Sequence, residues 1–245
     1  MWYTGDNTKK EVFLDMHKLL VFDLDGTLAP VGKAMSEKTV VMLKQLESKG
    51  HIIVLCSGKP TYYLCGMLRQ VGLDRPWMIG ENGSVFQQGV DLPPVRFEIY
   101  PFGQKAKDQL TLFRKRIDEA WQGALWYQPN EVAVTPFPYE EACFERIQEV
   151  LDAHPEDVSE LAVYRHGDCF DVLPKCISKA EGVKHLVGLL GLTAEDVAAF
   201  GDGSNDLPMF GYADLSVGIG DGVKGMTDLH FDRIEEALAV LMEEK

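Results

Sequence analysis

Three short, unbroken apolar runs mark the chain at Leu19–Phe22, Ile52–Cys56 and Val197–Phe200. Apolar runs of this length without alternation are typical of strands buried on both faces, as in a parallel sheet covered by helices. Between the first two runs lies a stretch with helical periodicity, which Ser36 can cap at its start and Gly50 can end. The pattern therefore predicts a β-α-β unit and an α/β fold.

The same order of elements returns toward the end of the chain. Ser178-Lys-Ala-Glu181 has the spacing of a capping box and predicts a helix that runs to about Leu190. The third apolar run follows it. A further short strand is predicted at Leu215–Ile219, and an amphipathic helix around Ile234–Met242 closes the pattern.

The middle of the chain has a different pattern, in which a helix and two alternating strands occur twice. This order predicts a four-stranded antiparallel sheet with helices on one face, which is an α+β arrangement. We therefore expect a Rossmann-like parallel-sheet core, formed by residues 1–86 and 174–245, with a smaller α+β cap domain inserted at 87–173. The predicted elements of the insert are a helix over 103–121, strands over 124–128 and 131–135 around a Pro129-Asn130 turn, a helix over 139–153, and strands over 161–165 and 168–173.

Composition narrows the classes of partner. The 245 residues carry 24 Lys+Arg and 38 Asp+Glu, a net charge of −14. Nucleic acid and anionic membrane both need a cationic surface, so neither is expected as a main partner, and no apolar run approaches the ~18 residues of a membrane span. Five scattered cysteines without a C-x-x-C pair favour reduced thiols, and charges interrupt the N-terminal stretch, so we expect a cytoplasmic protein with an N-terminal extension of ~17 residues of no assigned role.

Polar residues follow the first two predicted strands directly. Asp23 and Asp25 lie two apart after the first strand, so their side chains can point to the same side, and Gly26 lets the chain turn away. Ser57 and Gly58 follow the second strand and precede a predicted helix start, where a hydroxyl and free backbone N–H groups form an anion site.

The third strand and the helix predicted after Ser178 add further groups. Asp202, Asn205 and Asp206 follow that strand, and Lys179 lies at the first position of the helix. Because the carboxyl ends of parallel strands share one edge of the sheet, we expect these groups to meet there. Clustered carboxylates repel a phosphate unless a hard divalent cation bridges them, and oxygen-only ligands suit Mg²⁺. The sequence thus predicts a site for Mg²⁺ and a phosphoryl group.

The four motifs, in order, resemble the haloacid dehalogenase superfamily of phosphotransferases over nearly all of the chain from Leu19 on. These motifs are D-x-D-G-T-L, a serine after a strand, a lysine, and G-D-x-x-N-D. An α-β-β repeat between the second and third motifs, together with Gly80-Glu-Asn-Gly83, looks like the sugar-phosphatase and phosphomannomutase-like branch, whose cap closes over small phosphorylated metabolites. Many relatives in this branch have arginine where this chain has Lys59.

The resemblance implies a role for each matched residue. Asp23 is expected to be the nucleophile that becomes an aspartyl-phosphate, and Asp25 the general acid and base. The expected metal ligands are Asp23, the backbone carbonyl of Asp25, Asp202 and, directly or through another ligand, Asp206. The groups expected to hold the phosphoryl group are Ser57, Gly58, Lys179 and Asn205.

The predicted activity is a magnesium-dependent phosphatase for a small phosphomonoester, such as a sugar phosphate or phosphoglycolate. A phosphomutase with the same nucleophile is the alternative, and a binding protein on an inactive enzyme fold is disfavoured because each catalytic position holds a competent residue. Asp25–Pro30 resembles the matching segment of trehalose-phosphate phosphatases, while Gly201–Asp206 resembles that of the general sugar-phosphatase group. The two resemblances point to different substrates and do not identify one sugar. Neither the oligomeric state nor the cap residues that select the substrate follow from the sequence.

Overall fold

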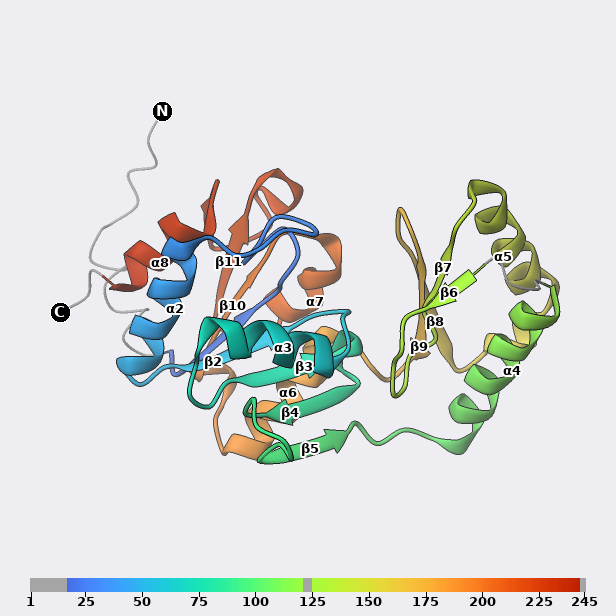
Figure 1. Ribbon diagram of the computed structural model, residues 1–245, viewed down its shortest axis with the longest axis horizontal. Coiled ribbons are helices and arrows are strands. Elements are labelled where there is room, and N and C mark those ends of the chain that lie inside the picture. Colours follow the sequence, from blue (N-terminus) through green and yellow to red (C-terminus); the bar gives the residue numbers. More distant parts are fainter. Residues whose placement is uncertain (1–16, 121–124, 243–245) are drawn as a thin grey trace. The chain divides into compact units, whose positions relative to one another are not determined.

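The computed structural model of the chain describes residues 17–120 and 125–242 (Figure 1). The predicted N-terminal extension lies outside the described residues, apart from His17. The chain forms two compact units: one is built from the chain up to Glu98 together with the chain from Lys179, and the other is Ile99–Ser178. None of the helices in the described ranges is long and apolar enough to cross a membrane. Nor does a disulfide link any of the five cysteines, all of which lie in those ranges.

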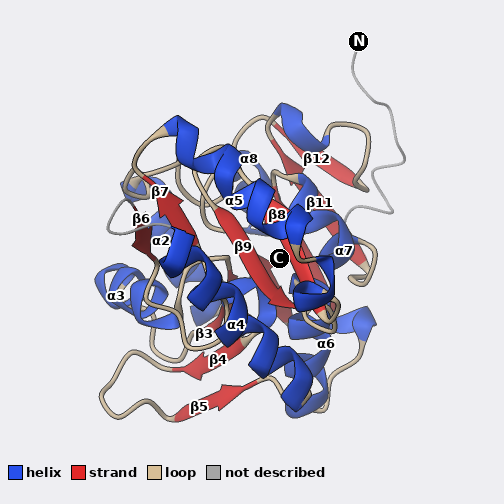
Figure 2. Cartoon of the chain, turned by 90° about the vertical axis from the view of Figure 1, so that its right-hand side faces the viewer, coloured by secondary structure: helices blue, strands red, loops and turns tan. Residues whose placement is uncertain are grey.

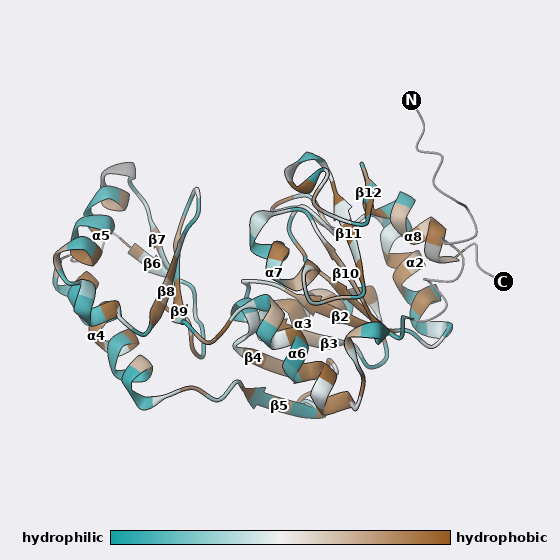
Figure 3. Cartoon of the chain, turned by 180° about the vertical axis from the view of Figure 1, so that it is seen from behind, coloured by the Kyte–Doolittle hydropathy of each residue, from teal (hydrophilic) through white to brown (hydrophobic). Residues whose placement is uncertain are grey.

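The first unit is built on an eight-stranded sheet of order β12-β11-β10-β1-β2-β3-β4-β5. The three strands predicted from the apolar runs are confirmed as β1, β2 and β10. They pair in parallel at the centre of the sheet, with β1 between the other two. Every residue of the first strand is fully buried, as a strand with helices on both faces requires. The central strands of this sheet have the colour of hydrophobic residues in Figure 3. The strands of this sheet are β1 (Leu19–Phe22), β2 (Ile52–Cys56), β3 (Trp77–Gly80), β4 (Val85–Gln88), β5 (Arg96–Ile99), β10 (Val197–Gly201), β11 (Leu215–Ile219) and β12 (Leu229–Phe231).

Helices cover both faces of this sheet. Three of them pack on the face that carries Leu20 and Phe22, and Phe22 stacks on Phe200 with ring centroids 4.4 Å apart. A fourth, α6, approaches the other face, where Gly182 lies against Ile79. The helices of the first unit are α2 (Glu37–Ser48), α3 (Thr61–Val71), α6 (Lys179–Leu190), α7 (Leu207–Phe210) and α8 (Ile234–Met242), with α2, α3 and α8 on the first face.

The predicted cap of α2 is confirmed, because the hydroxyl of Ser36 accepts a hydrogen bond from the N–H of Thr39 at 3.0 Å. That hydroxyl also donates to a carboxylate oxygen of Glu235 in α8, at 2.8 Å. Partial burial raises the pKa of Glu235, but the hydrogen bonds it accepts outweigh this effect and hold the pKa below its usual value. Glu235 thus joins the two helices through a polar contact.

We expect Glu235→Gln to lower the free energy of unfolding at neutral pH by less than about 1 kcal/mol, as for a partly exposed polar contact. A carboxyl whose pKa is lowered by folding stabilises the protein above its unfolded-state pKa of about 4.3 and loses this contribution as the pH falls through the folded-state pKa. Urea unfolding of both proteins at pH 7 and near pH 4 measures the effect. The gap between them should narrow on acidification, and a gap that widens contradicts the assignment.

The second unit has the predicted α-β-β order twice, but the predicted continuous four-stranded sheet is wrong. Its strands form two separate antiparallel pairs, β6-β7 and β8-β9, joined by a single bridge between Val134 and Val172 (Figure 2). The elements are α4 (Gln104–Ala120), β6 (Leu125–Tyr127), β7 (Pro136–Pro138), α5 (Glu141–Ala153), β8 (Leu161–Arg165) and β9 (Phe170–Pro174).

The predicted strand over 131–135 is also wrong, because the partner of β6 begins at Pro136. Leu125 pairs with Pro138 and Tyr127 with Pro136, so residues 128–135 form a loop rather than a two-residue turn. The two prolines have no N–H to donate, which limits how far β7 can extend a sheet. Polar side chains of the loop bond to one another instead: the Asn130 amide donates to the Thr135 hydroxyl, which donates to Asp171.

The boundaries of the two units differ from the predicted domain boundaries. The second unit begins after Glu98 and ends at Ser178. The sequence pattern indicated an insert that begins after residue 86 and ends at residue 173. The first difference arises because the chain after the parallel strands turns back: β4 pairs antiparallel with β3, and β5 follows β4 in the same sheet.

Candidate active site

The first candidate residue continues the pairing of the sheet beyond β1. The N–H of Asp23 donates to the carbonyl of Phe200 at 2.9 Å, so the residue is fixed between the ends of β1 and β10, and its side chain is buried. The chain then turns at Gly26, whose φ of +90° lies in the region that favours glycine. Asp25 is partly exposed; its carboxylate accepts the N–H of Gly32 at 3.3 Å and lies 3.6 Å from the Lys59 ammonium.

The centre of the site is a buried ammonium between two carboxylates. Lys179 Nζ donates to Asp23 Oδ1 at 2.5 Å and to Asp206 Oδ1 at 2.7 Å, and only 1% of its side chain is exposed. The three residues come from the end of β1, the start of α6 and the loop after β10. The structure therefore brings these three side chains together at the ends of the strands.

Asp206 also organises the loop that carries it. Its second oxygen, Oδ2, accepts the N–H groups of Asp202 and Gly203, each at 3.1 Å. Gly201 makes room for this arrangement, since a Cβ there would lie 2.5 Å from Cγ of Asp206. Asp202 is in turn held from the first loop, by the hydroxyl of Thr27 at 3.0 Å. Both oxygens of Asp206 are thus engaged within the protein.

The residues present fit a hard divalent cation. Carboxylate oxygens of Asp23, Asp202 and Asp206 lie within 4.8 Å of one another. An all-oxygen donor set of this kind matches Mg²⁺, which is bound through one or two carboxylates and keeps several waters. Because Asp206 already binds Lys179 and two backbone N–H groups, Asp23 and Asp202 are the carboxylates better placed to ligate an ion directly.

The electrostatics of the cluster favour an added positive charge. The pKa of Asp23 is raised to about 7, because burial outweighs the opposing effect of Lys179 and the charges of Asp206 and Asp202 add to the rise. Burial likewise raises the pKa of Asp202. For Lys179, burial acts to lower the pKa, but the two carboxylates outweigh it and raise the pKa, so the ammonium stays charged. One ammonium does not balance three carboxylates, and a cation would stabilise their ionised forms.

The end of β2 lies next to an unusual turn after β3. The carbonyl of Ser57 accepts the N–H of Asn82, and the carbonyl of Lys59 accepts the N–H of Glu81, both at 3.0 Å. Glu81 and Asn82 have φ values of 52° and 56°, a conformation that non-glycine residues adopt at an energetic cost and that often marks functional sites. The Gly80–Gly83 turn noted in the sequence therefore holds the loop that contains Ser57.

Helix α6 packs directly on this turn. A Cβ at Gly182 would lie 2.7 Å from the Cα of Gly83, so only glycine permits the contact. Lys179 lies one turn earlier on the same helix, and the close approach brings its side chain under the strand ends. The sequence does not predict this contact, because the two glycines are about a hundred residues apart and no local pattern connects them.

The remaining predicted residues lie at the edge of this cluster. Ser57 is buried, and its Oγ accepts the N–H of Lys59 at 3.3 Å. Asn205 is exposed, and Gly58 is partly exposed. Thr27, which the sequence argument missed, lies within the D-x-D-G-T-L motif and could have been found there. Burial raises the pKa of Cys56 to about 12, so this neighbouring thiol stays protonated.

We expect Gly26→Ala to disable the site. A Cβ at this position would lie 2.2 Å from Asp202 Oδ2, which displaces a proposed metal ligand, and activity should fall by about 10²-fold or more. Gly50→Ala is the matched control, because Gly50 has φ +99° and nothing within 4 Å of its added Cβ. Both variants should lose about 1–2 kcal/mol of stability from backbone strain. Phosphate-release kinetics measure the activity of both variants, and thermal melts measure their stability. Equal activities would refute the role given to Gly26.

The chain matches the model of the haloacid dehalogenase-like hydrolase family over residues 20–91 and 127–229. This match covers well over half of the chain, and the chain therefore belongs to that family of enzymes. Among curated relatives, it is 26% identical to a phosphoglycolate phosphatase of Methanopyrus kandleri, over 89% of this chain and 91% of that protein. It is 23% identical to a 5-amino-6-(5-phospho-D-ribitylamino)uracil phosphatase of Bacillus subtilis, over 79% of this chain and 84% of that protein.

Solved structures share the fold. A haloacid dehalogenase-like hydrolase from Bacteroides thetaiotaomicron superposes with a TM-score of 0.73 at 22% identity, covering 91% of this chain and 98% of that one. The C-terminal domain of a trehalose-6-phosphate phosphatase from C. albicans gives a TM-score of 0.68 at 18% identity. The superposition covers 95% of this chain and 94% of that one. The predicted fold class, a Rossmann-like α/β core with an inserted α+β unit, is confirmed.

Proposed function

We propose that the chain is a magnesium-dependent phosphatase that hydrolyses a small phosphomonoester, such as a sugar phosphate or phosphoglycolate, through an aspartyl-phosphate on Asp23. The observation that carries the proposal is the buried ammonium of Lys179 held between Asp23 and Asp206, with Asp202 within reach of the same point. The names of the curated relatives, which are phosphatases, support the same reaction class. The thiols and the acidic charge fit a cytoplasmic location.

In the proposed first step, a carboxylate oxygen of Asp23 attacks the phosphorus of the substrate. The bond between phosphorus and the ester oxygen breaks, and Asp25 gives its proton to the leaving alkoxide. In the second step Asp25 takes a proton from water, whose oxygen attacks the phosphorus and releases phosphate and the Asp23 carboxylate. Asp25 suits both tasks because 27% of its side chain is exposed, so product alcohol and water can reach it.

The remaining residues bind and orient. Asp23, Asp202 and the backbone carbonyl of Asp25 would hold Mg²⁺, which would neutralise phosphoryl oxygens and so let an anionic substrate approach the carboxylates. Lys179 would bind another phosphoryl oxygen. The Ser57 hydroxyl, the Gly58 N–H and the Asn205 amide are proposed to complete this binding. Asp206 would position Lys179 and the loop that carries Asp202.

The two units take separate roles in this proposal. The residues above lie in the unit that contains the eight-stranded sheet, and they act on phosphate and metal only. We assign selectivity for the organic part of the substrate to the inserted unit, Ile99–Ser178, as a cap domain.

A panel of phosphomonoesters assayed for phosphate release tests the proposal. We expect turnover of at least one small phosphorylated metabolite with Mg²⁺ present, and loss of about 10²-fold or more on chelation with EDTA, restored by added Mg²⁺. Hexose 1-phosphates should be followed for hexose 6-phosphate as well as for free phosphate. Dominant isomerisation would make the protein a phosphomutase, and no turnover across the panel would overturn the enzymatic role.

A further inference from the structure

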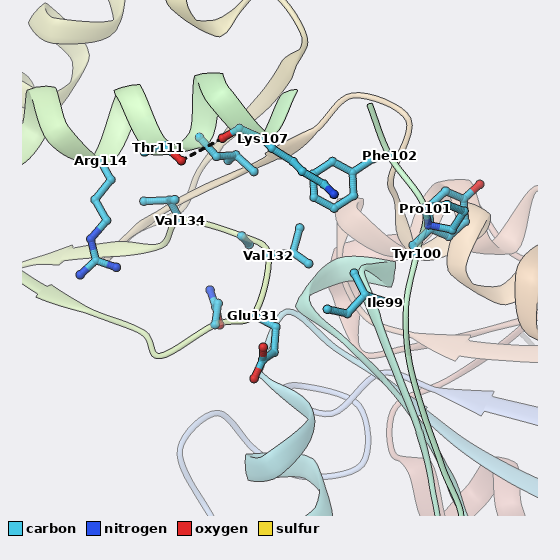
Figure 4. Close-up of a pocket in the computed structure, with 13 residues that line it drawn as sticks. Ile99, Tyr100, Pro101, Phe102, Lys107, Thr111, Arg114, Glu131, Val132 and Val134 are labelled. Carbon is cyan, nitrogen blue, oxygen red and sulfur yellow. Dashed lines mark hydrogen bonds between the residues drawn. The ribbon is translucent and has the colours of Figure 1, made fainter. Parts of the chain in front are cut away.

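A pocket of about 720 Å³ lies wholly within the inserted unit. Its walls are the segment Ile99–Phe102, one face of α4, and the loop Asn130–Val134 (Figure 4). Ligand sites for small molecules have volumes of about 300–1,000 Å³. The pocket is therefore large enough for a small organic molecule, and none of the proposed catalytic or metal-binding residues lines it.

Two cations on α4 line this pocket. Lys107 and Arg114 are seven residues apart, so they share one face of the helix at a separation of about 10 Å along its axis. Each is packed over an aromatic ring: Lys107 Nζ lies 5.3 Å from the centroid of Phe102, and the guanidinium of Arg114 lies 4.4 Å from that of Tyr127. Figure 4 shows the two side chains diverging along the pocket. The two charged groups therefore face different parts of the pocket.

The surface between the two cations is apolar. Leu110, Val132 and Val134 contribute to it, and the first two are buried. The hydroxyl proton of Thr111 is already donated to the carbonyl of Lys107, at 3.0 Å. The side chain of Glu131 lies across from α4, on the loop that forms the opposite wall (Figure 4). In a chain of net charge −14, the pocket thus combines two cations on α4, an apolar middle and one carboxylate on the opposite wall.

The part of the chain that forms most of this pocket lies outside the family match. That match skips residues 92–126, which include both the Ile99–Phe102 segment and α4. The groups that carry the proposed chemistry lie within the matched residues and in the other unit. The pocket and the residues proposed to bind phosphate and metal therefore belong to different units.

We propose that this pocket binds an elongated organic dianion with an acidic group at each end of an apolar chain. Arg114 binds one acidic group, Lys107 binds the other, and the middle lies on Leu110, Val132 and Val134. The proposal concerns binding alone and does not depend on the proposed phosphatase activity.

Calorimetric titration with linear α,ω-dicarboxylates tests it. The probes are succinate, adipate, suberate and sebacate, and we expect suberate and sebacate to bind more tightly than succinate, because succinate is too short to span the two-turn spacing of the cations. Octanoate, with the same chain as suberate and one carboxylate, should bind about tenfold more weakly than suberate, as expected for the loss of one charged hydrogen bond. The absence of saturable binding by every dicarboxylate, or affinity that does not depend on length, would overturn the proposal.

Variants on α4 locate the binding. Lys107→Gln and Arg114→Gln should each weaken suberate binding about tenfold. Lys115→Gln, the same change on an exposed lysine of the same helix outside the pocket wall, should have no effect. Thr111→Trp keeps both cations and fills the pocket, so it should abolish binding while circular dichroism shows an intact fold. Suberate binding that persists unchanged in Thr111→Trp, or that inorganic phosphate with Mg²⁺ displaces, would contradict this location.

Discussion

Asp23→Asn is expected to lower phosphatase activity by at least about 10⁴-fold, the scale seen when a catalytic nucleophile is removed. The amide has no anionic oxygen to attack phosphorus, and it weakens the proposed metal site at the same time. Folding should survive, because Asn has the shape of Asp and Lys179 keeps its contact with Asp206. Since burial raises the pKa of Asp23, the charge itself is costly to bury and its removal should leave the melting temperature unchanged or higher.

Asp214→Asn is the matched control for this variant. Asp214 is a partly buried aspartate of the same unit, paired with His17 at 3.1 Å and outside the carboxylate cluster. Kinetics and thermal melts on both variants, with wild type alongside, give the comparison. If Asp23→Asn keeps more than a tenth of wild-type activity, or if Asp214→Asn loses as much, the nucleophile is assigned to the wrong residue.

Lys179→Met should have the second large effect, on both stability and activity. Removing the ammonium leaves Asp23 and Asp206 buried without a partner, and breaking a buried pair in this way costs about 3–5 kcal/mol. Activity should fall by about 10²–10³-fold through the loss of a charge on the phosphoryl group. Urea unfolding, far-UV circular dichroism and phosphate-release kinetics measure the two effects.

The chain offers a control and a rescue for the lysine variant. Lys184→Met changes an exposed lysine on the same helix, paired with Glu181, and should alter stability by no more than about 0.5 kcal/mol. Asp206→Asn added to Lys179→Met removes one of the stranded charges and should recover part of the lost stability, although not the activity. Wild-type stability in Lys179→Met alone would show that the cluster does not depend on the ammonium.

The central strands and the chemistry at their ends were predictable because both depend on local pattern. Leu19–Phe22 and Val197–Gly201 are uniformly apolar and lie in the middle of the sheet. The rule that parallel strands end at one edge then brings Asp23 and Asp206 together, although they are far apart in the chain. Lys179 was predictable as well, from its place at the first position of the helix that the sequence pattern predicts after Ser178.

The features of the structure that the sequence does not predict depend on contacts between distant segments, or on prolines that have no backbone N–H to donate. Nothing local indicates that Gly182 lies against Gly83, or that Gly26 lies under the carboxylate of Asp202. In the inserted unit, the strand that pairs with β6 begins at Pro136, whereas the alternating pattern pointed to 131–135, and residues 128–135 form a loop. The turn with Glu81 in a left-handed conformation was noticed as a motif, but its hydrogen bonds to the loop after β2 required the structure.

The central claim, an aspartyl-phosphate on Asp23, can be tested by chemical trapping. Enzyme turning over its best substrate with Mg²⁺ is quenched with borohydride, which reduces an acyl phosphate to an alcohol, and the peptide that contains Asp23 is sequenced by mass spectrometry. We predict that Asp23 is converted to homoserine under turnover, and that this conversion disappears without substrate, with EDTA, and in Asp23→Asn. Reduction at a different carboxylate, or rapid phosphate release with Asp23 unmodified in every quench, would contradict the account.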